Sequence, residues 1–212
     1  GRASLAFAFN DDTNLYVSVA EGFRSGGQSN TNVPSFEEET VRTYETGVKT
    51  SLFNQQLYAE LTYYYSDFKD YQGFAFDPVT VTSFVTNSGD AVIKGVEWNL
   101  RWTATDSLTF TFAGNTTDGE LVEVPFTVAT QLEGDPLDFV PENNISLMGE
   151  YSFSWSNTTE GFFRVDFNHQ GESSVVNRNA GLVGQVRFDS ENLDFLNISL
   201  GAEWDSTRLE LF

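Results

Sequence analysis

The sequence predicts an all-β protein, an antiparallel up-and-down wall of a transmembrane β-barrel. Three observations lead to this fold class. Polar and apolar residues alternate with a period of two along the candidate strands. Short and long connections alternate along the chain, which is typical of a barrel with one tight rim and one loop-bearing rim. Aromatic residues make up 15% of the 212 residues. No run of about 18 apolar residues offers a transmembrane helix.

The connections between the candidate strands are predicted to be of two kinds, according to their length. Short polar stretches are expected to form tight turns at 11–14, 54–56, 106–107, 157–159 and 205–206. Long stretches are expected to form loops on the opposite rim at 25–38, 73–83, 114–142 and 171–194.

Each candidate strand has an apolar face and a polar face. In chain order, the clearest alternation covers 57–65, 96–103, 145–155, 163–168 and 196–204. Candidate strands of about 9–14 residues can cross a bilayer at a tilt, whereas soluble strands average about 6 residues. The pattern predicts about ten strands. We interpret these strands as part of a larger wall, because the two ends of the chain share no closing signal.

Three tryptophans are predicted to form a membrane girdle. Trp102, Trp155 and Trp204 each lie beside a tight turn on the apolar face of a strand. Interfacial aromatic residues are expected at this level of a barrel wall. The rim of tight turns is therefore expected to face the periplasm, and the loop-bearing rim the outside.

The composition excludes several classes of function. The net charge of −20 argues against binding to nucleic acid, which requires clustered basic residues. It also argues against a peripheral domain attracted to anionic lipid. Much of the acid lies in expected loops, at 37–39 and 118–142, where it favours solubility over cation capture.

No catalytic or metal-binding pattern is found in the sequence. His169 is the only histidine, and there is no cysteine to complete a metal site with it. Neither a G-x-S-x-G nor an H-E-x-x-H motif is present. We expect no enzymatic activity and no cofactor, with His169 at the interface or in a loop.

Four segments, in this order, resemble the barrel of TonB-dependent outer-membrane receptors. They are 16–27 (YVSVAEGFRSGG), 36–49 (FEEETVRTYETGVK), 63–72 (YYYSDFKDYQ) and 87–97 (NSGDAVIKGVE). The resemblance covers about residues 15–212 and corresponds to the later part of the barrel. It implies that residues 1–212 are a partial barrel domain, with the plug domain, the TonB box and the last strands elsewhere.

The resemblance also implies a function. Such receptors are 22-stranded barrels blocked by an N-terminal plug. They bind a scarce ligand in their outer loops and import it across the outer membrane of Gram-negative bacteria. The ligand is a ferric siderophore, cobalamin, haem or an oligosaccharide, and the energy comes from the TonB–ExbB–ExbD system. Two alternatives remain open: a complete small outer-membrane barrel that acts as a pore or a structural protein, and a secreted carbohydrate-binding β-sandwich.

Two sets of side chains are candidates for contacts in such a receptor. Polar residues expected to face the lumen either contact a plug or solute, or form cross-strand charge pairs, and we favour the pairs. These lumenal residues are Glu45, Lys49, Glu97, Asn99 and Arg101. Aromatic residues in or beside the long loops either stack on a ligand or pack the loops. These loop candidates are Tyr71, Phe74, Phe76, Phe84 and Phe126.

Overall fold

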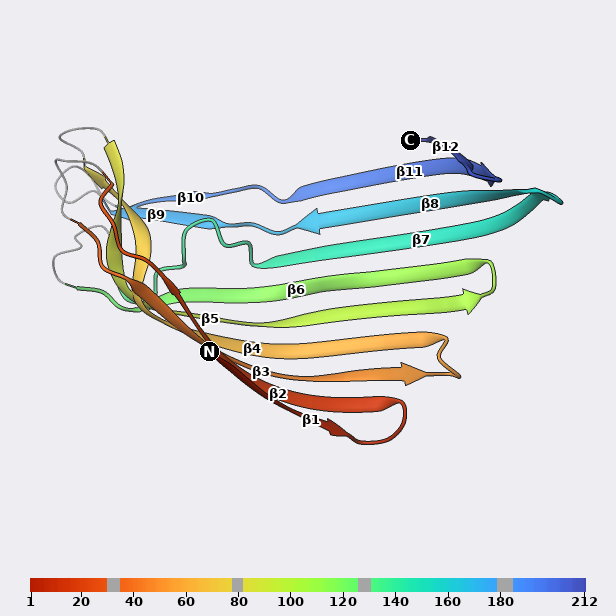
Figure 1. Ribbon diagram of the computed structural model, residues 1–212. Helices are drawn as coiled ribbons and strands as arrows, with labels where there is room; N and C mark the ends of the chain where they lie inside the picture. Colours follow the sequence, from red (N-terminus) through yellow and green to blue (C-terminus); the bar gives the residue numbers. More distant parts are fainter. Residues whose placement is uncertain (30–34, 78–81, 126–130, 179–184) are drawn as a thin grey trace.

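The computed structural model describes residues 1–29, 35–77, 82–125, 131–178 and 185–212. Figure 1 shows that most strands lie side by side in one wall, with tight turns at one end. No helix of the described residues is long and apolar enough to cross a membrane. The strands of the described residues are β1 (Arg2–Ala8), β2 (Thr13–Arg24), β3 (Glu39–Leu52), β4 (Leu57–Asp77), β5 (Thr82–Thr105), β6 (Leu108–Glu123), β7 (Asn143–Ser156), β8 (Thr159–Gln170), β9 (Ser174–Arg178), β10 (Gln185–Asp189), β11 (Leu193–Trp204) and β12 (Thr207–Leu211).

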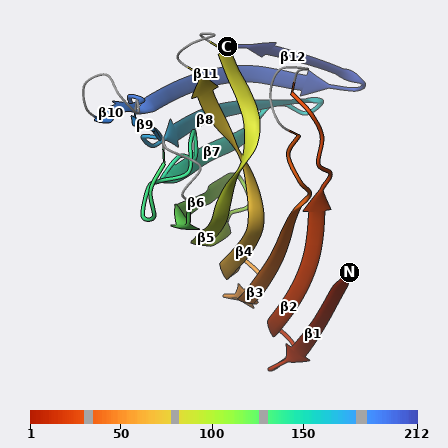
Figure 2. The ribbon, with the colours of Figure 1, turned by 90° about the vertical axis from the view of Figure 1, so that its left-hand side faces the viewer.

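Ten of these strands form a single antiparallel sheet. Their order is β1-β2-β3-β4-β5-β6-β7-β8-β11-β12, so each strand lies beside its neighbours in the sequence. Only β9 and β10 leave this order, because they pair with each other between β8 and β11. Figure 2 shows that the sheet is strongly curved. The predicted all-β, up-and-down wall of about ten strands is therefore confirmed.

The register keeps the two faces of the sheet chemically distinct. On the polar face, Lys49 of β3 lies opposite Glu60 of β4, which lies opposite Asn99 of β5. One residue further on, Leu61 of β4 lies opposite Trp98 of β5 on the apolar face. A slip of one residue would exchange the two faces, so the alternation in the sequence fixes the register.

The apolar face has no second layer over it in the described part of the chain. Leu61, Leu147 and Ile198 are 50%, 42% and 52% exposed. A soluble sandwich would bury such residues against another sheet, and a contiguous exposed apolar surface of this kind marks a membrane or protein contact. This arrangement favours a barrel wall over the β-sandwich alternative.

The expected boundaries of the long loops are wrong in three places. β4 continues to Asp77 and β5 begins at Thr82, so most of the expected loop 73–83 is a hairpin. β6 continues to Glu123, and the expected loop 171–194 contains β9 and β10. Phe, Val and Thr favour strands. The expected strands had the length that is needed to cross a membrane. In the structure, strand pairing continues beyond that length.

A small core lies at the loop-bearing rim. Ala91 and Leu121 are buried on the otherwise polar face of β5 and β6, where Leu137 packs against them. The segment 131–142 is held there by backbone hydrogen bonds. Leu121 N–H donates to Asp135 O at 2.9 Å, and Leu137 N–H donates to Gly119 O at 3.0 Å. Beside β6, the irregular segment 131–142 therefore extends the wall toward the loop-bearing rim beyond Asn143, where β7 begins.

Candidate functional site

The polar face is crossed by side chains that bridge three strands. The hydroxyl of Tyr16 on β2 lies 2.6 Å from Oγ1 of Thr62 on β4, and the ring passes over Gly47 on β3. An equivalent bridge joins Tyr64 on β4 to Thr117 on β6. Side chains on second-neighbour strands approach each other on the concave side of a curved sheet. The polar face is therefore the candidate for the face that lines a lumen.

The predicted lumenal residues of β3 are paired. Oγ of Ser18 donates a hydrogen bond to Oε2 of Glu45 at 2.9 Å. Nζ of Lys49 lies 2.6 Å from Oε1 of Glu60, whose other oxygen accepts a hydrogen bond from the hydroxyl of Tyr58 at 3.1 Å. Around β3, the polar face thus consists of cross-strand pairs that satisfy one another.

The predicted lumenal residues of β5 are not paired in this way. Glu97, Asn99 and Arg101 share the polar face of β5 and are exposed. None of the three makes an ion pair or a side-chain hydrogen bond to another described residue. We call these three exposed residues the β5 strip.

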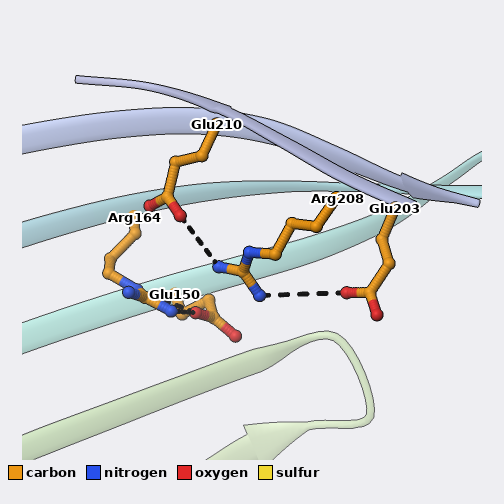
Figure 3. Close-up of polar contacts among 5 residues, drawn as sticks. All are labelled: Glu150, Arg164, Glu203, Arg208 and Glu210. Carbon is orange, nitrogen blue, oxygen red and sulfur yellow. Dashed lines mark hydrogen bonds and ion pairs between the residues drawn. The ribbon is translucent and has the colours of Figure 1, made fainter. Parts of the chain in front are cut away.

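A second charged cluster lies on the polar face near the tight turns of β7, β8, β11 and β12. Nη2 of Arg164 lies 2.6 Å from Oε2 of Glu150. Arg208 bridges two carboxylates, at 3.2 Å from Nη2 to Glu210 and 3.8 Å from Nη1 to Glu203 (Figure 3). The cluster holds three carboxylates and two guanidinium groups, and it joins the last strands of the described sheet.

Phe162 lies beneath this cluster. Its ring centroid is 4.2 Å from the guanidinium carbon of Arg208 and 5.8 Å from that of Arg164, so both cations lie near the ring. The ring covers Gly201 of β11, and Phe162 is only 6% exposed. None of these residues was predicted from the sequence as a site residue. The available signal was a phenylalanine in the polar register, directly opposite a glycine in the paired strand.

The three predicted girdle tryptophans lie at the same end of the wall. Trp102, Trp155 and Trp204 are on the apolar face of β5, β7 and β11, each next to a tight turn. Their exposed fractions are 48%, 65% and 37%. This placement is suited to the level of lipid headgroups, where aromatic side chains are favoured.

Four aromatic ligand candidates, expected in or beside the long loops, lie on β4 and β5, which corrects the expected loop boundaries. Tyr71 packs edge-on against Phe68 at 5.8 Å beside the small rim core, so its ring stabilises the rim. Phe74 is on β4 and 56% exposed. Of the others, Phe76 belongs to β4, Phe84 belongs to β5 and Phe126 lies outside the described residues.

Two carboxyl groups of the rim, those of Asp138 and Asp189, have shifted pKa values. Burial raises the pKa of Asp138, which accepts a hydrogen bond from the backbone of Val176 and lies near Asp135. The Arg187 guanidinium, 2.6 Å from Asp189, holds the pKa of that carboxyl below its usual value. The described residues contain no cluster of three or more His, Cys, Asp or Glu that could hold a metal ion.

His169 lies on β8 close to the loop-bearing rim. Its Nδ1 lies 2.7 Å from Oδ1 of Asp194, the residue directly opposite on β11. The histidine is therefore held in a cross-strand pair at the outer end of the wall.

A model of the TonB dependent receptor-like β-barrel family matches residues 1–211. The ferric yersiniabactin uptake receptor FyuA from Yersinia pestis is 18% identical with a TM-score of 0.73, and the match covers 99% of this chain and 30% of FyuA. The siderophore receptor PirA from Acinetobacter baumannii is 17% identical with a TM-score of 0.65, covering 99% and 36%. The pyoverdine outer membrane receptor FpvA from Pseudomonas aeruginosa is 16% identical with a TM-score of 0.65, covering 96% and 29%.

Proposed function

Because the chain belongs to the TonB-dependent receptor-like β-barrel family, we propose that it forms part of a receptor that imports a scarce ligand across the outer membrane. The observation that carries this proposal is the single curved sheet with an exposed apolar face and a polar face bridged by side chains. Such a wall separates lipid from a water-filled lumen. The family is one of receptors and transporters, and we assign no catalytic chemistry to the chain.

The ligand that we propose is a ferric siderophore. FyuA, PirA and FpvA are described by their names as receptors for ferric yersiniabactin, a siderophore and pyoverdine. Phe74, which is 56% exposed, is our candidate for an aromatic contact with a ligand at the rim. Cobalamin and oligosaccharides are the alternative ligand classes.

We propose that residues 1–212 form part of a larger barrel domain in a parent protein that also carries a plug and a TonB box. The chain spans about a third of the solved receptor chains that it resembles, with 30%, 36% and 29% coverage. In this arrangement the lumenal residues of β3 and the β5 strip face the plug or a passing solute. The energy for import comes from the TonB–ExbB–ExbD system, and the location is the outer membrane of a Gram-negative bacterium.

Uptake of an iron-labelled siderophore by cells tests this proposal. Cells that express the parent protein are compared with cells that lack it, each with and without a functional TonB. We expect uptake of a cognate siderophore only when both proteins are present. If siderophore uptake is the same in cells with and without the parent protein, a siderophore is rejected as the ligand. Steady conductance of the purified protein in a planar bilayer, independent of TonB, would favour a passive pore.

A further inference from the structure

Two parts of the loop-bearing rim are joined by the side-chain amides of Gln72 and Asn87, of which that of Gln72 is buried. The first is the outer hairpin, which consists of the described residues of 72–89. The second, which we call the strap, consists of residues 24–29 and 35–38, from the last residue of β2 to the residue before β3. Figure 2 shows that the outer ends of β4 and β5 extend beyond the neighbouring strands. The strap and hairpin are far apart in the sequence, and side-chain hydrogen bonds join them.

Gln72 holds the strap at three points. Its Nε2 lies 3.2 Å from Arg24 O, 3.1 Å from Ser25 O and 3.0 Å from Glu37 O. Its backbone N–H donates to Oε2 of Glu39 at 2.7 Å. Gln72 is 5% exposed and Glu39 is 8% exposed, so neither can exchange these partners for water. A buried amide surrounded by carbonyl oxygens fixes where the backbone of the strap lies.

Asn87, directly opposite Gln72, also holds the strap at Glu37. Its Oδ1 accepts a hydrogen bond from Glu37 N–H at 2.6 Å, and its Nδ2 donates to Glu37 O at 3.2 Å. The same Nδ2 donates to Asp70 O at 2.6 Å. Further out, Val85 N–H donates to Oγ of Ser29 at 2.9 Å. One amide thus replaces the backbone partner that a strand would supply to Glu37.

The direction of the outer hairpin is fixed at its base. The pairing of β4 with β5 shifts register between Phe68 and Tyr71 and again before Gln72, which bends the hairpin. Asp70 has a φ of 54°, which costs energy for a residue other than glycine. Asp90 stabilises this bend, because it accepts a hydrogen bond from Asp70 N–H at 3.2 Å and lies 2.6 Å from Nζ of Lys69.

We propose that Gln72 and Asn87 are positioning residues that hold the strap and the outer hairpin as one preformed arm at the rim. The arm presents the exposed Phe74 in a fixed position instead of becoming ordered around a ligand. The contact of this arm with a ligand rests on the proposed function. The rigidity of the arm does not, because it follows from the contacts of Gln72 and Asn87 alone.

Hydrogen exchange of the full-length receptor in detergent, without any ligand, tests this proposal. Gln72→Glu keeps the size of the side chain, removes both amide hydrogens and places a carboxylate against three carbonyl oxygens. We expect the backbone amides of residues 24–29 and 35–38 to exchange at least about tenfold faster, as in a locally opened segment. Exchange in the membrane-spanning parts of β2 and β3 should stay unchanged, which shows that the barrel is folded. Gln55→Glu, in an exposed tight turn at the other end, is the matched control.

Asn87→Ala provides an independent variant if Gln72→Glu does not fold. We expect it to accelerate exchange at residues 35–38 more than at residues 24–29, because Asn87 contacts Glu37. Unchanged exchange of the strap in a folded Gln72→Glu or Asn87→Ala receptor would overturn the proposal. Since no ligand is used, this result is separate from the uptake experiment: a receptor without siderophore uptake can still have a rigid arm.

Discussion

The hydroxyl of Tyr64 lies 3.0 Å from Oγ1 of Thr117, although β5 separates the strands that carry the two residues. The ring passes over Gly95 of β5, the residue directly opposite Tyr64. A side chain at position 95 would occupy the path of the phenol. The same arrangement recurs where Tyr16 crosses a glycine of β3. Such crossings tie three strands together on the polar face.

Gly95→Ala should destabilise the wall. A Cβ at this position would lie 2.6 Å from the hydroxyl of Tyr64 and closer still to Thr116 O, so the backbone or the ring must move. Overpacking of this kind costs about 1–3 kcal/mol, measurable as the free energy of urea unfolding of the receptor in lipid vesicles. Gly149→Ala is the control, because its nearest contact is 3.4 Å from the ring of Phe110. Equal stability of the two variants would contradict the crossing as a steric constraint.

Leu100→Arg should reduce stability by about 2–4 kcal/mol in a bilayer, the cost of a charge on the lipid-facing side near the midplane. Leu100 lies on the apolar face opposite Ala59 and Phe112. Its neighbour Asn99 faces the other way and is exposed, so Asn99→Arg should cost much less. The same unfolding experiment in vesicles measures both. If both variants lose the same stability, the apolar face does not contact lipid.

Asp138→Asn should slow hydrogen exchange in the segment 131–142 at neutral pH. Burial raises the pKa of Asp138 above its usual value of 3.8, so the folded segment binds a proton more tightly than the unfolded one. The stability contributed by protonated Asp138 is complete below about pH 3.8 and is lost as pH rises through the folded pKa. The asparagine retains the acceptor for Val176 N–H and has no charge to bury.

The pH dependence distinguishes this cause from a general improvement in packing. After correction for the intrinsic exchange rate, the difference between Asp138→Asn and the native protein should disappear at low pH. A difference that stays constant with pH would exclude the buried charge as the cause.

Trp155 should lie at a shallower depth in the bilayer than Trp98. Trp155 is 65% exposed next to a tight turn, whereas Trp98 lies four residues from Trp102, further from the turns of the same rim. In receptors that retain one of these tryptophans, lipids brominated near the headgroup should quench Trp155 more strongly. Lipids brominated deep in the chain should quench Trp98 more strongly. Equal quenching profiles would contradict the girdle.

The face of the sheet on which each candidate residue lies was largely predictable from the sequence. The partners that each residue contacts were less predictable. Lys49 and Arg101 both follow from the alternation as polar-face residues, but only Lys49 has a charged partner in the described structure. The pairing depends on which residue lies opposite and on how far each side chain reaches. For Tyr71 the sequence left open a contact with a ligand or packing within the loops, and in the structure Tyr71 packs in the same small core as Leu137 of the segment 131–142.

By itself, the sequence determined the all-β class, the strand order, the two faces and the rim of tight turns with Trp102, Trp155 and Trp204. These features follow from a period of two and from local turn chemistry, which involve residues close together in the chain. Only the tertiary structure decided that Gln72 holds Glu37 and that Tyr64 reaches Thr117 across Gly95. These contacts join residues 35 and 53 positions apart. Only strand pairing and the curvature of the sheet bring them together.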